Sequence, residues 1–368
     1  MSWSIKIARI FGIPIYLHWT FLILMVWLAV SQLMQGATTA EAIQGLVFPL
    51  AIFSCVVLHE LGHAVAAQRF GVPTRDITLL PIGGVARLER MPEKPSEELV
   101  VALAGPLVNV VIALLLYAAG TRVAFRSEDP EMLMHGGMLS RLLLVNVFLV
   151  LFNLIPAFPM DGGRVLRSLL AMTMDYGKAT RIAAGVGQFL AIVFAYIGLQ
   201  HNPFLILIAL FVWIGAQSEA TQVSERLELE GTPVGDAMLT DFAMLRPSDT
   251  LGHAVERLLA GSQQDFPVYD GQYFLGVLAR ADLLRGLAQS GRDATIEGFV
   301  QPGLEPITLK DPLVPALNRL RETGVPCVPV LDQGRVAGLL SLENIAELLM
   351  VKAALGSRDA VVTSGARA

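Results

Sequence analysis

The chain has 368 residues and a formal net charge of −5, and 54% of its residues are hydrophobic whereas only 16% are charged. Its mean hydropathy of +0.58 excludes an ordinary soluble enzyme and is typical of a polytopic membrane protein. No nucleic-acid partner is expected.

Charge-free apolar runs locate the predicted membrane spans. They lie within residues 10–40, 42–58, 99–121 and 142–160, and two more fill residues 182–218 on either side of His201-Asn202-Pro203. This tripeptide predicts a tight turn between two helices, and each run can cross about 30 Å of hydrocarbon. The sequence therefore predicts six transmembrane helices within residues 1–222, the first of them retained rather than cleaved as a signal.

Basic residues indicate the orientation of these spans. Lysine and arginine collect before the first span and in the loops after the second and fourth spans, whereas the alternate loops contain few of them. Cytoplasmic loops of membrane proteins carry such an excess. We expect a multi-pass protein of the cell membrane, in contact with lipid, with both termini cytoplasmic.

The second span ends in the sequence His59-Glu60-Leu61-Gly62-His63. Positions four apart share one face of a helix, so His59 and His63 can bind one Zn²⁺ per chain. Glu60 then lies beside the metal, where it suits a general base that acts on water. The alternative is a pair of packed histidines, although ionisable groups at membrane depth usually face partners, water or metal.

The loop of residues 71–94 contains two short β-compatible runs, residues 74–80 and 85–90, around Gly83-Gly84. They predict a membrane-associated β-hairpin, whose free edge can pair with an unwound substrate strand. The alternative is a basic loop that contacts lipid headgroups. In the next span we expect a packing role for Gly105, and Asn109 is a candidate to support a metal ligand.

The fourth apolar run is followed by the best candidate for a third metal ligand, Asp161. Pro156 and Pro159 should break the helix, and Gly162-Gly163 permits a turn that brings the carboxylate back towards the histidines. The alternative is an Asp161 that is solvated or caps a following helix.

Together these segments resemble the site-2 protease family of intramembrane zinc metalloproteases. The resemblance rests on H-E-x-G-H in a membrane helix, followed by N-x-x-P-x-x-P-x-D-G at residues 153–162, and it extends to residues 80–86 and 104–109. It implies that His59, His63 and Asp161 bind Zn²⁺ and that Glu60 activates water. It also implies that Asn153 positions the substrate or polarises the scissile carbonyl, the alternative being a hydrogen bond between helices.

A different composition begins near Gly231, and an internal repeat appears with an offset of 62 residues. The matched pairs are Asp249 with Asp311, Leu251 with Leu313, Pro267 with Pro329 and Gly276 with Gly338. Each copy predicts an α/β unit of helix, strand, hairpin, strand and helix. The repeat resembles a tandem pair of CBS domains, residues 232–288 and 294–350, followed by a flexible tail over residues 351–368.

That resemblance implies a regulatory module that binds an adenine nucleotide and can form a homodimer. The nucleotide pattern has Ser or Thr three residues before Asp, and each copy retains one member: Asp282 follows Ala279, and Ser341 precedes Asn344. The alternatives are a module for dimerisation or docking without ligand, and Asp282 as a plain helix cap.

The function that these patterns predict is a zinc metalloendopeptidase that cuts within or near transmembrane segments of membrane-anchored regulatory proteins. CBS pairs also occur on channels and transporters, so a CBS-regulated divalent-cation path lined by the same ionisable residues is the alternative. A third possible function is that of a proteolytically inactive membrane scaffold. A scaffold would not need Glu60, so the intact motif argues against this function.

Overall fold

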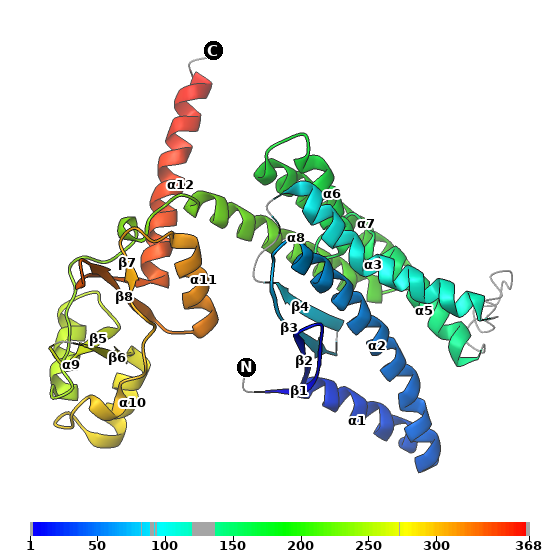
Figure 1. The fold of residues 1–368 in the computed structure, drawn as a ribbon, viewed down its shortest axis with the longest axis horizontal. Helices are drawn as coiled ribbons and strands as arrows, with labels where there is room; N and C mark the ends of the chain where they lie inside the picture. Colours follow the sequence, from blue (N-terminus) through cyan, green and yellow to red (C-terminus); the bar gives the residue numbers. More distant parts are fainter. Residues whose placement is uncertain are drawn as a thin grey trace. The chain divides into compact units, whose positions relative to one another are not determined.

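The computed structural model describes residues 3–81, 83–88, 92, 94–119, 137–271 and 273–365. The chain divides into two compact units, Met1–Val223 and Ser224–Ala368, and Figure 1 labels their elements. The boundary falls within one long helix.

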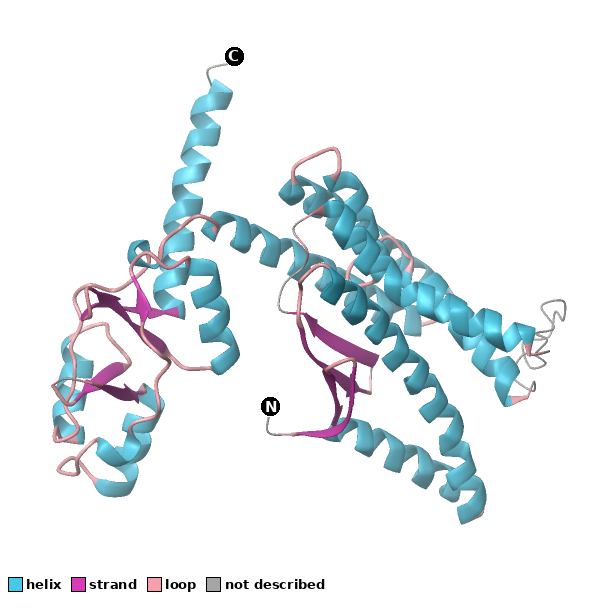
Figure 2. Cartoon of the chain, viewed as in Figure 1, coloured by secondary structure: helices cyan, strands magenta, loops and turns pink. Residues whose placement is uncertain are grey.

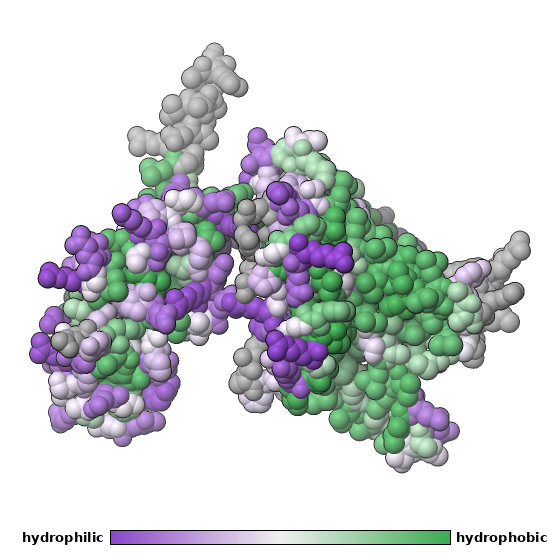
Figure 3. Space-filling view, in the orientation of Figure 1, coloured by the Kyte–Doolittle hydropathy of each residue, from purple (hydrophilic) through white to green (hydrophobic). Residues whose placement is uncertain are grey.

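The first unit is mainly helical. Its described helices are α1 (Trp19–Met34), α2 (Thr39–Arg69), α3 (Pro95–Ala118), α5 (Met138–Asn153), α6 (Asp161–Ala171), α7 (Tyr176–Gln200) and α8 (Phe204–Leu229). Of these, α2, α3, α7 and α8 are long and apolar enough to cross a membrane, whereas α1 and α5 are apolar but shorter. Figure 3 shows the broad hydrophobic surface of this unit. These four helices support a membrane-embedded unit, and the predicted total of six spans stays a prediction.

A four-stranded sheet packs against helix α2. Its strands lie in the order β1 (Ser4–Ile10), β2 (Ile13–His18), β3 (Thr74–Leu80) and β4 (Gly83–Leu88). The antiparallel pair β3 and β4 forms the predicted hairpin, but Gly83 and Gly84 belong to β4 and pair with Leu80 and Leu79, whereas they were expected between the two strands. Residues 89 and 90 of the predicted second strand lie outside the described residues. Strand β2 joins the hairpin in parallel. The sequence did not indicate the hairpin of β1 and β2, because its apolar residues run into the next helix.

Burial explains why this sheet lies where it does. Ile13, Ile15 and Ile77 point from the sheet into one core with Leu61 and Ala64 of α2. The core residues of α2 stand within or next to the His-Glu-x-x-His segment, so the sheet packs directly on the helix that carries this motif.

Helix α5 ends earlier than the apolar run predicted. The run extends to residue 160, but the helix stops at Asn153 and an irregular loop leads to Asp161, the first residue of α6. The loop is apolar because it is buried: Ala157, Phe158 and Met160 are all at most 4% exposed. Pro156 and Pro159 prevent a continuous helix here, as the sequence indicated.

The second unit repeats one arrangement of helices and strands (Figure 2). Its elements are η1 (Val234–Asp236), α9 (Leu251–Ala260), β5 (Phe266–Tyr269), β6 (Phe274–Leu278), α10 (Arg280–Ser290), η2 (Glu297–Phe299), β7 (Ile307–Thr308), α11 (Leu313–Thr323), β8 (Cys327–Asp332), β9 (Arg335–Ser341) and α12 (Leu342–Gly365). The first helices of the two copies, α9 and α11, start 62 residues apart (313 − 251), which is the repeat found in the sequence.

Each copy has its own hydrophobic core, and the two copies interlock. Val234 and Ala237, at the start of the first copy, belong to the core of the second. The backbone amide of Leu239 also donates to the carbonyl of Leu339 at 2.8 Å. Helix α12 continues to Gly365, through most of the segment expected to be a flexible tail.

Candidate active site

The three predicted metal ligands converge at one point. His59 and His63 extend from one face of α2, and Asp161 opens α6. The two Nε2 atoms are 3.1 Å apart, and Asp161 Oδ2 lies 3.1 Å from His59 Nε2 and 3.2 Å from His63 Nε2. All three side chains are buried. Residues about 100 positions apart in sequence therefore supply one compact set of two nitrogens and one oxygen.

This set of atoms fits a divalent metal. The Nδ1 atom of His63 lies 2.7 Å from the carbonyl oxygen of Val101, which can only accept, so Nδ1 carries the proton and Nε2 keeps its lone pair. His59 Nδ1 lies 2.5 Å from Oδ1 of Asn109 in the same way. Two lone pairs and a carboxylate oxygen repel one another at such distances unless a cation lies between them. Two imidazoles and one carboxylate are also a ligand set of catalytic zinc sites.

A glycine allows helix α3 to come this close. A Cβ atom on Gly105 would lie only 2.2 Å from Nε2 of His63. Glycine is therefore required where α3 crosses the ligand histidine, which agrees with the packing role expected for it.

Glu60 stands beside the ligand set and against strand β4. Its Oε2 accepts a hydrogen bond of 3.3 Å from the backbone amide of Ala86. A Cβ atom on Gly84 would lie 2.8 Å from Glu60 Cγ. The edge strand β4 thus reaches the candidate general base, a contact that the sequence did not predict.

The asparagines divide into two groups. Asn109 is fully buried against His59, where a supporting residue was expected. Asn153, in contrast, donates to the Leu149 carbonyl of its own helix at 3.0 Å. Sequence reasoning missed Asn146, which is fully buried on α5 and accepts a hydrogen bond from Asn109 at 2.9 Å. The signal that could have identified it is a polar residue in the middle of an apolar run.

In the second unit the predicted nucleotide residues have partners within the chain. Asp282 is 2% exposed and accepts hydrogen bonds from Gln301 Nε2 at 2.7 Å and Arg285 Nη1 at 2.8 Å. Ser341 donates to Asn344 Oδ1 at 2.7 Å, next to the start of α12. Asp282 lies in the first turn of α10 and is buried rather than a plain solvent-exposed cap.

An apolar helical unit that buries the two histidines of a His-Glu-x-x-His motif, with a carboxylate as the third candidate ligand, defines a membrane metalloprotease as the class of protein. Comparison with known proteins agrees. Residues 47–126 and 133–194 match Peptidase family M50, and residues 234–289 and 299–351 match the CBS domain.

Two curated relatives span nearly the whole chain. Zinc metalloprotease MJ0392 of Methanocaldococcus jannaschii is 31% identical over 355 residues, which cover 95% of this chain and 97% of the relative. A candidate zinc metalloprotease of Synechocystis sp. is 28% identical over 377 residues, 96% of this chain and 97% of the relative. The solved structure of a site-2 protease from M. jannaschii is 40% identical, with a TM-score of 0.42, and covers 59% of this chain and 95% of its own.

The chain belongs to Peptidase family M50: it is a membrane metalloprotease of the site-2 protease type that carries a pair of CBS domains. These matches do not favour the alternative of a cation channel or transporter.

Proposed function

We propose that this protein is an intramembrane zinc protease that cuts within or near transmembrane segments of membrane-anchored regulatory proteins. The observation that carries the proposal is the convergence of His59 Nε2, His63 Nε2 and Asp161 Oδ2 within 3.1–3.2 Å of one another. These residues would hold one Zn²⁺ per chain.

Zinc, when bound, lowers the pKa of a water molecule and polarises a carbonyl group. Glu60 takes the proton from the attacking water and returns it to the leaving amine, as a general base and then a general acid. Its carboxylate already lies against the β4 backbone through Ala86, so substrate and base approach the same edge.

The substrate would bind as an extended strand. A peptide bond inside a helix is shielded by its neighbours, and addition to a free sheet edge holds an unwound segment through its backbone. β4 is an edge strand of the sheet and contacts Glu60. Asn153, at the end of α5, is proposed to orient the substrate carbonyl after it releases the bond to Leu149.

The membrane arrangement proposed for residues 1–222 has six spans, with α1 and α5 as the two shorter ones. Both termini lie in the cytoplasm, and the site faces the cytoplasmic side of the cell membrane. The basic loops support this orientation, and the apolar surface of the unit contacts lipid.

Metal content and proteolysis, measured together, test the proposal. We expect one zinc per chain in the detergent-purified protein, with loss of zinc and of cleavage of a model transmembrane substrate in His59→Ala and Asp161→Ala. Glu60→Gln should keep the zinc and cut about 10²- to 10⁴-fold more slowly. A Glu60→Gln variant that cleaves at the wild-type rate, or a metal-replete wild type without zinc, would refute the proposed chemistry.

The CBS pair, residues 232–350, is proposed to regulate cleavage by binding an adenine nucleotide near Asp282 and near Ser341 and Asn344, and to support a homodimer. The family match supports this role. A ribose hydroxyl at Asp282 would replace the donor of Gln301 or Arg285. ATP and AMP titrations of the wild type and of Asp282→Ala test it: equal binding by both proteins contradicts a role for Asp282.

A further inference from the structure

We propose that Asn146 is a positioning residue that acts through Asn109 to hold His59 in the tautomer whose Nε2 can bind a metal. The inference rests on the metal site proposed above. The observation behind it is a row of buried hydrogen bonds that runs from Asn146 on α5 through Asn109 on α3 to His59 on α2.

The direction of each bond in this row follows from its far end. Asn146 Nδ2 donates to the backbone carbonyl of Leu142 at 2.8 Å, and a carbonyl can only accept. The Oδ1 of Asn146 therefore faces Asn109, whose Nδ2 must donate to it at 2.9 Å. This leaves Asn109 Oδ1 as the acceptor for Nδ1 of His59 at 2.5 Å. His59 consequently keeps its proton on Nδ1 and its lone pair on Nε2.

Asn109 alone cannot impose this state. The oxygen and nitrogen of an amide have nearly the same size, so a rotated Asn109 would present a donor to His59 and favour the opposite tautomer. Such a rotation places two acceptor oxygens face to face between Asn109 and Asn146, and both side chains are fully buried, where an unpaired polar group is costly. Asn146 thus removes the ambiguity, with a further contact from its Nδ2 to Cys55 Sγ at 3.5 Å.

The two ligand histidines are held in the same tautomer, with the proton on Nδ1, by different numbers of hydrogen bonds. His63 Nδ1 contacts a backbone carbonyl directly, that of Val101. His59 reaches a carbonyl through two amide side chains. His63 is therefore an internal reference, because changes at Asn146 leave its partner in place.

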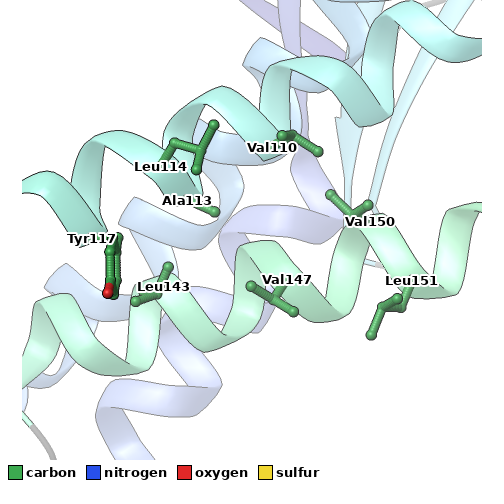
Figure 4. A pocket seen from close by; sticks show the side chains of 8 residues that line it. All are labelled: Val110, Ala113, Leu114, Tyr117, Leu143, Val147, Val150 and Leu151. Carbon is green, nitrogen blue, oxygen red and sulfur yellow. The ribbon is translucent and has the colours of Figure 1, made fainter. Parts of the chain in front are cut away.

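Apolar side chains surround this row of hydrogen bonds, and one of them, Leu143, can be changed as a matched control. Leu143, one turn before Asn146 on α5, lines a pocket of about 340 Å³ between α3 and α5 (Figure 4). Leu143→Ala should loosen the packing of these helices and leave the row of amides intact. It separates loss of packing from loss of the hydrogen-bond direction.

Nitrogen-15 solid-state NMR of the full-length, metal-free protein in bilayers, with labelled histidine, tests the inference across a series of pH values, and the tautomers are compared where the ¹⁵N shifts show that both imidazoles are neutral. In the wild type and in Leu143→Ala, His59 and His63 should both carry the proton on Nδ1. In Asn146→Leu, His59 should become a mixture of tautomers while His63 stays unchanged. Zinc affinity, measured by chelator competition, should fall about 10- to 100-fold.

A rescue variant makes the test specific. Asn109→Asp, added to Asn146→Leu, gives His59 a carboxylate that only accepts, so the single tautomer should return. A wild type with the proton on Nε2 of His59 overturns the inference, and this measurement needs no variant to fold. It is also overturned if Asn146→Leu keeps one His59 tautomer and wild-type zinc affinity. If the wild type binds no zinc, the proposed protease site fails, and the tautomers of the metal-free protein still decide this inference.

Discussion

Gly105 leaves no room for a side chain next to a candidate metal ligand. Its α-carbon lies against the ring of His63, and a Cβ atom would approach Nε2 of that ring to 2.2 Å. We expect Gly105→Ala to displace the ligand histidine and weaken zinc binding at least about tenfold, as measured by chelator competition. Gly185→Ala on α7 is the control, because its Cβ meets nothing within 4 Å.

Gly84 offers the complementary test, because it faces the base rather than a ligand. A Cβ atom there would lie 2.8 Å from Glu60 Cγ and 3.1 Å from Val56 Cγ1. Gly84→Ala should therefore move the carboxylate and slow cleavage about 10- to 100-fold while zinc content stays at the wild-type value. Loss of zinc in this variant would show that β4 supports the ligands instead of the base.

At the scale of the elements, a buried ion-pair cluster holds α6, the helix that begins with Asp161. Arg167 is fully buried and pairs with Glu98 of α3 and Glu219 of α8. Its guanidinium also lies 5.1 Å from the ring centroids of Phe158 and Tyr176. One side chain thus ties α6 to two other helices and to the loop before Asp161.

Removing this arginine should be far more costly than removing an exposed one. Arg167→Met leaves two carboxylates without their partner, and breaking a buried ion pair costs about 3–5 kcal/mol. We expect a large fall in the thermal unfolding midpoint in detergent. Arg181→Met, at an exposed position of α7, should stay within about 0.5 kcal/mol of the wild type. Equal midpoints for the two variants would rule out a structural role for the cluster.

The end of α5 shows how far local sequence signals can predict the bounds of a helix. The two prolines predicted a break in the apolar run, but hydrophobicity alone placed its end at residue 160 rather than at Asn153. A buried loop and a buried helix have the same composition. Only the core formed by Ala157 and Met160 with α7 and α8 distinguishes them.

At the scale of the whole molecule, the stability of the second unit depends on pH through the carboxyl group of Asp311. The backbone amide of Thr308 donates to Asp311 Oδ2 at 2.7 Å, which lowers the pKa of that carboxyl. Because the folded-state pKa is lowered, the stabilisation is present above the unfolded-state pKa and is lost as pH falls through the folded-state value.

Asp311→Ala should therefore lower the urea midpoint of the second unit at pH 7, and the difference from the wild type should shrink as pH falls through the folded-state pKa of Asp311. The midpoint can be followed by protection of the β8 amides from hydrogen exchange. Asp293→Ala, at an exposed position, is the control. A difference that persists unchanged in acid would mean that charge on Asp311 plays no part.

The sequence by itself determined the class of protein, the identities of His59, Glu60, His63 and Asp161 as candidates, and the repeat of the second unit. Each of these is a local pattern: the i, i+4 spacing of a helix, a run of apolar residues, or a constant offset between copies. The tertiary structure decided that Asp161 meets the histidines, that β4 reaches Glu60 and that Asn146 directs His59 through Asn109. Such contacts join helices far apart in the chain, and they depend on how the helices pack and on which polar groups that packing leaves without water.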